Sequence, residues 1–357
     1  MANSDPSEKT KPMRKQVEEY IVSLQDQIVS SFETLDPGAP AFKRDSWVRA
    51  QGGTGQSCVF ACPTDDVAVA QSTVLEKAGV NISIVHGTLP PAAIKQMRAD
   101  HTSMPLPDRP DGLPFFAAGI SLVVHPRNPH APTVHANYRY FEITEPTEGT
   151  AGGSSPGELL AWWFGGGCDL TPSYLYEADA THFHSTLKTV CDKHGAQLYP
   201  AFKKWCDEYF YIPHRAETRG VGGIFFDDLN EGPHARLPPP PAAAPRPSTP
   251  ADIFAFVRDL GDAFVPSYLP ILTARHSLPH TPLQRRWQLV RRGRYVEFNL
   301  VYDRGTKFGL MTPGARIESI LMSLPETARW EYMSDMGEEG TEEGRLMVVL
   351  RTPREWV

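Results

Sequence analysis

The feature that most constrains the fold is a pair of strand-like segments joined by a proline-rich turn. Residues 134–140 alternate strictly between apolar and polar side chains, and residues 121–125 begin and end with polar ones. Side chains with a period of two point to opposite faces of a strand. Residues 126–132 hold three prolines, which exclude a helix or a central strand there. The sequence therefore predicts a two-stranded hairpin over residues 119–143.

One face of this hairpin would carry polar side chains from both strands. They are Ser121, His125, His135, Asn137 and Arg139, whereas the other face would carry Val134, Ala136, Tyr138 and Tyr140. A face that is merely solvent-exposed more often carries Lys, Glu and Thr, and the sequence around this one is aromatic. We therefore favour a binding face over a simple water-facing one.

Helical periodicity marks further elements on either side of the hairpin. Apolar residues recur at helical spacing over residues 13–32, 177–194 and 200–210. Gly195 follows the second of these as its expected C-cap. Strand-like sequence occurs at residues 81–86 and 222–227.

The C-terminal third is expected to add a strand and a helix. Residues 295–302 alternate Val296, Phe298, Leu300 and Tyr302, which predicts a strand. A helix is expected after Thr312–Pro313 and before Pro325. Its predicted buried residues are Ile317, Ile320, Leu321 and Leu324. Strands and helices do not alternate regularly, so the pattern favours an α+β domain with a largely antiparallel sheet.

A proline-rich stretch, residues 238–250, interrupts the chain. It holds seven prolines and no larger apolar side chain, a composition that favours extended conformation. Thr249, Pro250 and Asp252 then fit the N-cap, N1 and N3 positions of a new helix. We expect a surface insertion within one domain, and a linker between two domains is the weaker alternative.

Composition excludes several kinds of partner. A net charge of −7 argues against general nucleic-acid binding. The longest apolar stretch, residues 115–124, is about half the length that spans a bilayer, so no transmembrane segment is expected. Residues 1–16 mix acidic and basic side chains, unlike a mitochondrial transit peptide. We therefore expect a cytoplasmic protein with a disordered tail over residues 1–11.

The five cysteines fit reduced, structural thiols. A zinc site on Cys58 and Cys62 is a weaker alternative, because no second pair of cysteines accompanies them.

A second candidate segment is a run of three aromatic residues and three glycines at residues 162–167. Successive glycines let the backbone approach a flat or crowded ligand closely. Asp169 stands next to that backbone. It also has an ordinary interpretation as a turn or capping residue before Thr171–Pro172, and the local sequence alone favours that interpretation.

The twelve histidines raise the question of a metal site. His184 would point inward from its helix, and His125, His135 and His214 would come from other segments. No HxxxH or HExxH spacing is present, and a lone inward histidine is more often a hydrogen-bonded core residue. We expect no bound metal, and a site on these four histidines remains the alternative.

Basic residues gather at positions 291–294, 303–307 and 316. Arginine forks and helix N-termini both bind carboxylates. Arg291 and Arg292 are expected on a solvated face of the molecule. Arg316 is the better ligand-binding candidate, because its neighbour Ile317 begins the predicted buried stripe.

Five long stretches of this chain resemble the oxygen-dependent coproporphyrinogen oxidase family. They are SLVVHPRNPHAPTVHANYRYFE, WWFGGGCDLTP, YPAFKKWCDEYF, GGIFFDDL and RRGRYVEFNLVYDRGTKFGLMTPGARIESILMSLPETARWEY. The likeness covers most of residues 47–357. Residues 61–73, 145–156 and 238–250 look longer than the family pattern and are expected to be loops.

The resemblance implies a single catalytic domain over residues 12–357, with a large flat antiparallel β-sheet flanked by α-helices. It also implies a homodimer. The matched interface segments are Val74–Ser83 and Tyr295–Glu331.

The resemblance also implies roles for individual residues. His135 matches the family's proposed proton donor, and Asp169 matches a carboxylate proposed to engage pyrrole N–H groups. Matches to substrate-contacting positions are Ser121, Asn137, Tyr138, Arg139, Gly314, Ala315 and Arg316. Some bacterial members are assigned a histidine-bound metal, so manganese or iron on His125, His135, His184 and His214 stays the minority alternative.

The activity that the resemblance implies turns two propionates of coproporphyrinogen III into vinyl groups. The products are protoporphyrinogen IX, carbon dioxide and hydrogen peroxide, with molecular oxygen as co-substrate and no other cofactor. The substrate carries four carboxylates, so arginines should hold it, and His135, Asp169 and Arg139 are the expected catalytic residues. Two alternatives remain, a metal-dependent oxidase and a carrier that binds tetrapyrroles without converting them.

Overall fold

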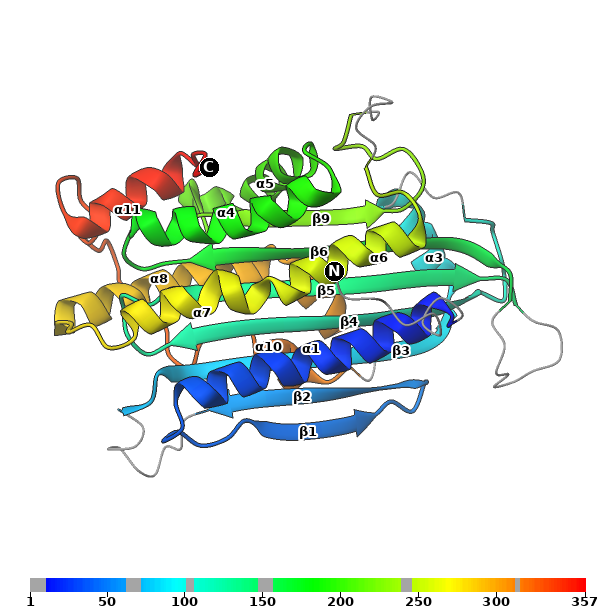
Figure 1. The fold of residues 1–357 in the computed structure, drawn as a ribbon, viewed down its shortest axis with the longest axis horizontal. Coiled ribbons are helices and arrows are strands. Elements are labelled where there is room, and N and C mark those ends of the chain that lie inside the picture. Colours follow the sequence, from blue (N-terminus) through cyan, green and yellow to red (C-terminus); the bar gives the residue numbers. More distant parts are fainter. Residues whose placement is uncertain (1–10, 62–71, 101–105, 147–156, 239–245, 312–314) are drawn as a thin grey trace.

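The computed structural model describes residues 11–61, 72–100, 106–146, 157–238, 246–311 and 315–357. A seven-stranded sheet forms its centre, in the order β1-β2-β3-β4-β5-β6-β9, and each neighbouring pair is antiparallel (Figure 1). Its strands are β1 (Lys43–Val48), β2 (Gly53–Ala61), β3 (Leu75–Leu89), β4 (Leu113–Pro126), β5 (Thr133–Thr144), β6 (Leu159–Thr171) and β9 (Gly223–Leu229). A separate ribbon pairs β7 (Tyr211–Ile212) with β8 (Glu217–Thr218).

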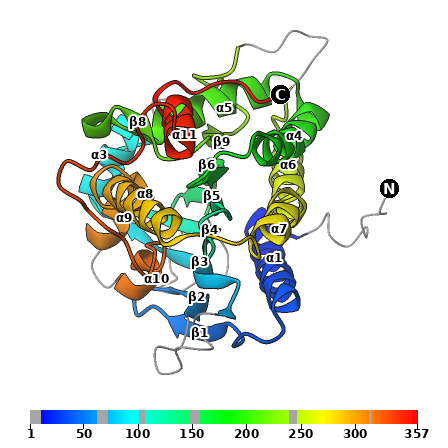
Figure 2. The same cartoon turned by 90° about the vertical axis from the view of Figure 1, so that its left-hand side faces the viewer.

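Helices cover both faces of the sheet. They are α1 (Met13–Leu35), α3 (Pro91–Asp100), α4 (Glu177–His194), α5 (Leu198–Tyr209), α6 (Pro250–Asp262), α7 (Phe264–Arg275), α8 (Pro282–Val301), α9 (Arg304–Met311), α10 (Ile317–Leu321) and α11 (Glu342–Arg351). Figure 2 shows α1, α4, α6 and α7 on one side of the sheet and α8, α9 and α10 on the other. The single α+β domain with a large antiparallel sheet is confirmed.

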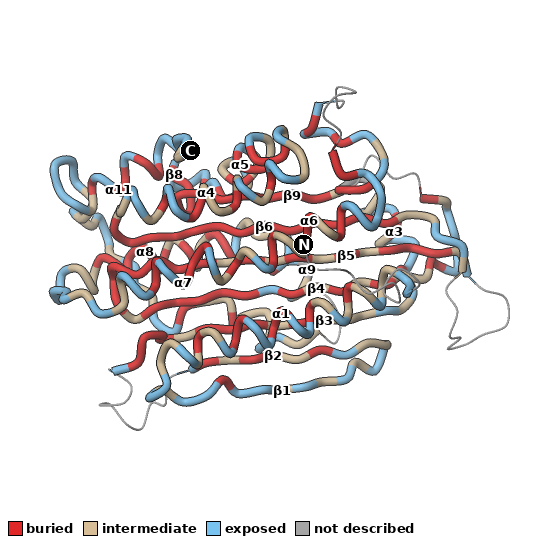
Figure 3. Tube along the Cα trace, in the orientation of Figure 1, coloured by how far each residue is buried: buried red, intermediate tan, exposed pale blue. Residues whose placement is uncertain are grey.

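The two faces of the sheet differ because side chains alternate along each strand. Toward α1, α4, α6 and α7 the strands present apolar side chains that form the main core. Examples from successive strands are Val80, Ile120, Leu122, Val134, Ala136, Phe164 and Phe226. The central strands are buried along most of their length, whereas the edge strand β1 is largely exposed (Figure 3). The opposite face is therefore the one available for ligand chemistry.

Several sequence predictions are confirmed at the level of single elements. The hairpin is β4–β5, and the helix at residues 177–194 is α4 with Gly195 as its C-cap. Thr249 caps α6 by accepting a hydrogen bond from the backbone N–H of Asp252, with Pro250 at N1. No helix among the described residues is long and apolar enough to span a membrane.

The strand predicted at residues 295–302 is wrong, because this segment is the end of helix α8. A capping box between Thr281 and Gln284 starts this helix at Pro282, well before the predicted strand begins. The buried side chains recur at helical spacing through Trp287, Arg291, Tyr295 and Phe298. The apolar residues that suggested a strand belong to the last turns of this helix, where too few positions remain to reveal the helical spacing.

The prediction that Arg291 and Arg292 lie on a solvated face is also wrong. Both side chains are buried, with 4 % of their surface exposed. Arg291 pairs with Glu217 on β8 at 2.5 Å, and Arg292 pairs with Glu76 on β3 at 2.8 Å. The Arg292–Glu76 pair joins α8 to the sheet, and the Arg291–Glu217 pair joins it to the β7–β8 ribbon. Because charged residues occupy these buried positions, a search for apolar residues alone did not detect the helical pattern.

The helix expected after Thr312–Pro313 is shorter than predicted. Within the described residues it comprises only Ile317–Leu321, and none of its four predicted core residues is fully buried; Met322 is the buried one. Its docking is polar instead, since the Ser319 hydroxyl lies 2.9 Å from that of Ser57 and the Ser319 carbonyl accepts a hydrogen bond from Asn81.

Parts of the predicted loops and the tail lie outside the described residues. These are residues 1–10, 62–71, 147–156 and 239–245. The described end of the proline-rich insertion 238–250 is not a bare surface segment, because Arg246 is buried. Its guanidinium donates hydrogen bonds to the carbonyls of Asn230, Gly232 and Pro247.

Candidate active site

The sheet face toward α8–α10 carries small and polar side chains in rows that cross the strands. Residues paired between antiparallel strands share a face, so the strand register defines each row. One row is Lys43, Val59, Gly79, Val123, His135, Asp169 and Gly223. The next is Asp45, Ser57, Asn81, Ser121, Asn137, Gly167 and Phe225. The third is Trp47, Gly55, Ser83, Gly119, Arg139 and Gly165. We call these three rows the polar face.

Aromatic clusters lie at both ends of the polar face. At one end the rings of Phe115, Phe141 and Trp163 stack in sequence, with centroids 5.5 Å and 4.5 Å apart. At the other end Phe210 and Phe298 pack together with centroids 5.2 Å apart. Between these ends Ser121 is exposed, so the glycine- and serine-rich middle is open to a ligand.

His135 and Asp169 form the central polar contact of the site. The strand register places them opposite each other on β5 and β6, and Nδ1 of His135 lies 2.8 Å from Oδ1 of Asp169. The Asp169 side chain is 3 % exposed and that of His135 is 17 % exposed. The carboxylate is therefore enclosed, whereas the imidazole reaches the polar face. Asn137 lies next to it, with its amide nitrogen 3.5 Å from Nε2 of His135.

Arg219, which was not predicted from the sequence, is a third member of this group and contacts Asp169 from the protein interior. One of its terminal nitrogens donates to both oxygens of Asp169, at 3.0 and 2.8 Å. Burial alone would raise the pKa of Asp169, but the positive Arg219 and the hydrogen bond to His135 hold that pKa below its ordinary value. Asp169 is therefore a fixed carboxylate rather than a free base or a turn residue.

Arg139 lies in the third row and pairs with a second carboxylate, Asp227. The two groups are 2.8 Å apart, and 40 % of the Arg139 side chain is exposed. A β-bulge in β9 opposite Gly165 places Asp227 there, with Asp228 at a positive φ of 55°. A side chain at Gly165 would collide with both groups, because a Cβ would lie 2.5 Å from Asp227 and 2.8 Å from Arg139. The glycine thus allows this ion pair to lie against the sheet.

Further arginines border the polar face. On α9, Arg304 has 57 % of its side chain exposed and lies 3.9 Å from Asp227. Just before α10, Arg316 forms an ion pair with Asp45 on β1. Four strand spacings separate β1, which carries the partner of Arg316, from β5, which carries Arg139, so these two strands lie roughly 19 Å apart across the sheet.

The structure brings together only some of the predicted site residues. Ser121, His135, Asn137 and Arg139 share the polar face, as the alternation predicted. The side chain of Tyr138 instead points to the apolar side, where its hydroxyl donates to the carbonyl of Leu260.

Of the predicted C-terminal contacts, Ala315 and Arg316 precede α10, and Gly314 lies outside the described residues. Asp227, like Arg219, is a charged neighbour that motif spacing alone did not place in the site.

The four histidines of the metal alternative have separate partners. His125 contacts Thr133 and the carbonyl of Ser323. His184 contacts the hydroxyl of Tyr199 and the carbonyl of Val221, and His214 contacts Tyr302 and Glu297. Burial lowers the pKa of His125 and of His184 to about 3. Across the residues that the structure describes, no three His, Cys, Asp or Glu side chains converge as metal ligands would.

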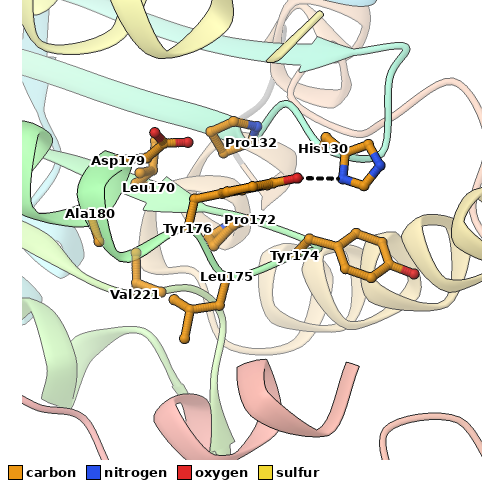
Figure 4. A pocket seen from close by; sticks show the side chains of 10 residues that line it. All are labelled: His130, Pro132, Leu170, Pro172, Tyr174, Leu175, Tyr176, Asp179, Ala180 and Val221. Atoms are coloured by element: carbon orange, nitrogen blue, oxygen red, sulfur yellow. Dashed lines mark hydrogen bonds between the residues drawn. The ribbon is translucent and has the colours of Figure 1, made fainter. Parts of the chain in front are cut away.

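A small cavity lies on the other side of β6 from Asp169. Figure 4 shows Tyr176 within it, and its hydroxyl is 2.9 Å from Nδ1 of His130. The wall also includes Leu170, whose side chain belongs to the main core. The cavity is separate from the polar face, and we assign no ligand chemistry to it.

The polar face can therefore bind carboxylates and exchange a proton. Arginine forks at its two sides suit carboxylate groups that lie far apart on one ligand. Because the ionised Asp169 has only acceptor atoms, Nδ1 of His135 carries a proton toward it, and Nε2 is the nitrogen that can gain or lose a proton at the polar face. The small residues between them leave room for a broad, flat molecule.

Comparison with known proteins identifies the family of this chain. Residues 16–356 match the family model described as coproporphyrinogen III oxidase. The human protein named oxygen-dependent coproporphyrinogen-III oxidase, mitochondrial, is 50 % identical over 345 residues, which cover 97 % of this chain and 67 % of the human one. The Drosophila melanogaster oxidase is 50 % identical over 345 residues, 97 % of this chain and 78 % of its own. The chloroplastic oxidase of Glycine max is 47 % identical over 353 residues, 99 % of this chain and 82 % of its own. This chain belongs to the coproporphyrinogen III oxidase family.

Proposed function

We propose that this protein is an oxygen-dependent coproporphyrinogen III oxidase that acts on the polar face. The observation that carries the proposal is the His135–Asp169 contact set between arginines on an open, glycine- and serine-rich sheet. The relatives are named for this activity. A tetrapyrrole with several propionates matches both the breadth of the face and its separated guanidinium groups.

The overall chemistry makes a proton source necessary. For each propionate, R–CH2–CH2–COO⁻ + O2 + H⁺ gives R–CH=CH2 + CO2 + H2O2. The Cβ–H bond breaks and its electron pair reduces oxygen, while carbon dioxide leaves from the neighbouring carbon. His135 is the group on the polar face that is suited to exchange this proton through Nε2, and Asp169 holds its ring in place. We propose that the substrate carboxylates bind at Arg139 and Arg316, with Ser121, Asn137 and the segment around Ala315 beside them.

The activity and the absence of a metal requirement are tested in one assay. Purified protein, treated with a chelator and transferred to metal-free buffer, is mixed with coproporphyrinogen III while oxygen uptake and protoporphyrinogen formation are followed. We expect full turnover with hydrogen peroxide as product. Tight substrate binding without oxygen uptake would indicate a carrier. Activity that returns only with manganese or iron would indicate the metal-dependent alternative.

Replacing Arg139 by alanine is expected to raise KM for coproporphyrinogen by about ten- to a hundredfold. A charge-assisted hydrogen bond to a carboxylate contributes about 1.5–3 kcal/mol, which corresponds to this range. The thermal midpoint should change little, because the Arg139 side chain is partly exposed. Steady-state kinetics and a thermal melt measure the two effects.

Arg236→Ala is the matched control for that variant. Arg236 has 39 % of its side chain exposed and pairs with Glu208 away from the polar face. Its loss should leave KM unchanged. A KM for Arg139→Ala that equals the control value would contradict the assignment of Arg139 to substrate binding.

We further propose a homodimer through Val74–Ser83 and Tyr295–Glu331. The second segment supports this, since it exposes Leu300, Val301, Leu310, Met311, Ile317 and Trp330. Sedimentation of the purified protein would contradict the proposal if it showed a monomer at micromolar concentrations.

The cytoplasmic location also stays a prediction. The human relative is named mitochondrial and the Glycine max relative chloroplastic, and imaging of the tagged full chain would decide.

A further inference from the structure

Arg219 is a charged residue of the site that is too enclosed to meet the substrate. It lies between β8 and β9 with 3 % of its surface exposed. Its guanidinium carbon is 4.0, 4.5 and 4.9 Å from the ring centroids of Phe210, Tyr295 and Phe298. These rings and the low exposure enclose the cation, so any effect it has on the reaction must pass through another residue.

Two hydrogen-bond partners fix the orientation of this guanidinium. One terminal nitrogen donates to Oδ1 of Asn299 on α8 at 2.8 Å, and the other donates to both oxygens of Asp169. A guanidinium is rigid and planar, so the bond to Asn299 fixes where its other terminal nitrogen meets the carboxylate of Asp169. The aromatic rings add cation–π attraction, which offsets part of the cost of burying the charge.

The fixed carboxylate in turn determines what His135 can present. Oδ1 of Asp169 accepts from both Arg219 and Nδ1 of His135. The imidazole also packs edge-on against Phe210, one of the rings around Arg219, with centroids 6.1 Å apart. The orientation of His135 therefore depends on Asp169 and on the same aromatic cluster that holds the arginine.

We propose that Arg219 is a positioning residue for catalysis, which holds Asp169 in place so that His135 presents Nε2 to the substrate. This inference rests on the proposed function, in which His135 exchanges the proton. Arg219 does not bind substrate in this arrangement. Its removal should consequently affect turnover and not substrate affinity.

The first test separates kcat from KM. Arg219→Gln should lower kcat by about ten- to a hundredfold, as expected when a residue that orients a functional side chain is lost. KM for coproporphyrinogen should stay within about twofold, less than the loss of one charge-assisted contact would produce. Arg219→Lys keeps the cation without the fork and should recover part of the lost kcat. A large rise in KM at constant kcat would instead make Arg219 a substrate ligand and overturn the proposal.

Arg291→Gln is the matched control for loss of a buried arginine. Arg291 is also 4 % exposed and has a buried glutamate partner, Glu217. Both variants leave a carboxylate without its partner and should melt at lower temperature. Only Arg219→Gln should lose kcat. Equal losses of kcat in the two variants at a temperature where both are folded would show that the effect is structural.

A double variant tests whether Arg219 acts through Asp169. If it does, Arg219→Gln with Asp169→Asn should turn over within about threefold of Asp169→Asn alone. The double variant leaves no unpaired buried charge, so it should melt at a higher temperature than either single variant, which keeps the test available if Arg219→Gln alone fails to fold. If the fold-loss of kcat in the double variant equalled the product of the losses in the two single variants, the proposal would be overturned. An inactive wild-type protein in the oxygen assay would refute the proposed function instead.

Discussion

Replacing Asp169 by asparagine is expected to lower kcat by about two to four orders of magnitude. Asparagine keeps the size of the side chain, but it bears no charge and presents an N–H group that competes with the Nδ1–H of His135. Oxidation of a bound propionate would then lack a correctly oriented proton donor. The substrate should still bind, because Arg139 and the open part of the polar face are unchanged.

The structure also predicts a stability cost for this variant. Asp169 is the buried partner of Arg219, and removing one member of a buried ion pair costs about 3–5 kcal/mol. Single-turnover decarboxylation under excess oxygen therefore has to be measured below the melting temperature, which a thermal melt gives. The local sequence alone suggested a turn aspartate that asparagine would replace without loss.

Asp179→Asn is the matched control for the Asp169 variant. Asp179 is partly buried, with 13 % of its side chain exposed, and it pairs with Arg275 through two hydrogen bonds of 2.8 and 2.9 Å, away from the polar face. It should lose stability without losing kcat. Near-normal turnover in a folded Asp169→Asn protein would return Asp169 to a structural role, and Asp227 would become the next carboxylate to test.

Replacing Glu76 by glutamine is expected to lower the free energy of unfolding by about 3 kcal/mol at pH 7. Burial alone would raise the pKa of Glu76, but Arg292 and Arg285 outweigh it and hold the pKa at about 2. The variant leaves Arg292 buried without its counter-ion. Since this pair joins β3 to α8, the docking of the helix that carries Tyr295 and Phe298 should weaken.

The contribution of Glu76 should depend on pH in one direction. Its pKa in the folded protein is below the ordinary value of 4.5. The stabilisation is therefore present above about pH 4.5 and is lost as the pH falls toward 2. Urea unfolding at pH 7 and pH 3.5 measures it, and the difference between wild type and Glu76→Gln should be smaller at the lower pH.

Glu208→Gln provides the comparison for Glu76→Gln. Glu208 forms an exposed pair with Arg236, and such pairs contribute about 0–1 kcal/mol. It should change the unfolding free energy little at either pH. A similarly small effect of Glu76→Gln would show that the buried pair adds no net stability.

Elements with a strong local signal were predictable from the sequence. The strict alternation of residues 134–140 correctly assigned His135, Asn137 and Arg139 to one face and Tyr138 to the other. The Thr249–Pro250 start of α6 followed from capping chemistry alone. In both cases the local conformation is determined by residues that are close together in the sequence.

The features that were missed depend on contacts between distant segments. The end of α8, residues 295–302, was predicted as a strand because the core positions before it are occupied by Arg291 and Arg292, which pair with Glu217 and Glu76 from distant segments. Arg219 stands 50 residues after Asp169 in the chain, and the pairing of β6 with β9 brings them together. The sequence held one indirect signal, the aromatic stretch YPAFKKWCDEYF, whose last residue, Phe210, is one of the three rings around the cation.

The register of the sheet makes the protein unequally tolerant of insertions and deletions. Removing one residue from the middle of β5 would rotate the rest of that strand by one position, exchanging polar and core side chains beyond the deletion. Each of the three long insertions falls between elements: after β2, after β5 and after β9. Chain length can therefore vary at these junctions without moving His135 or Arg139. Inside a strand, the smallest insertion or deletion that keeps every side chain on its original face of the sheet is two residues.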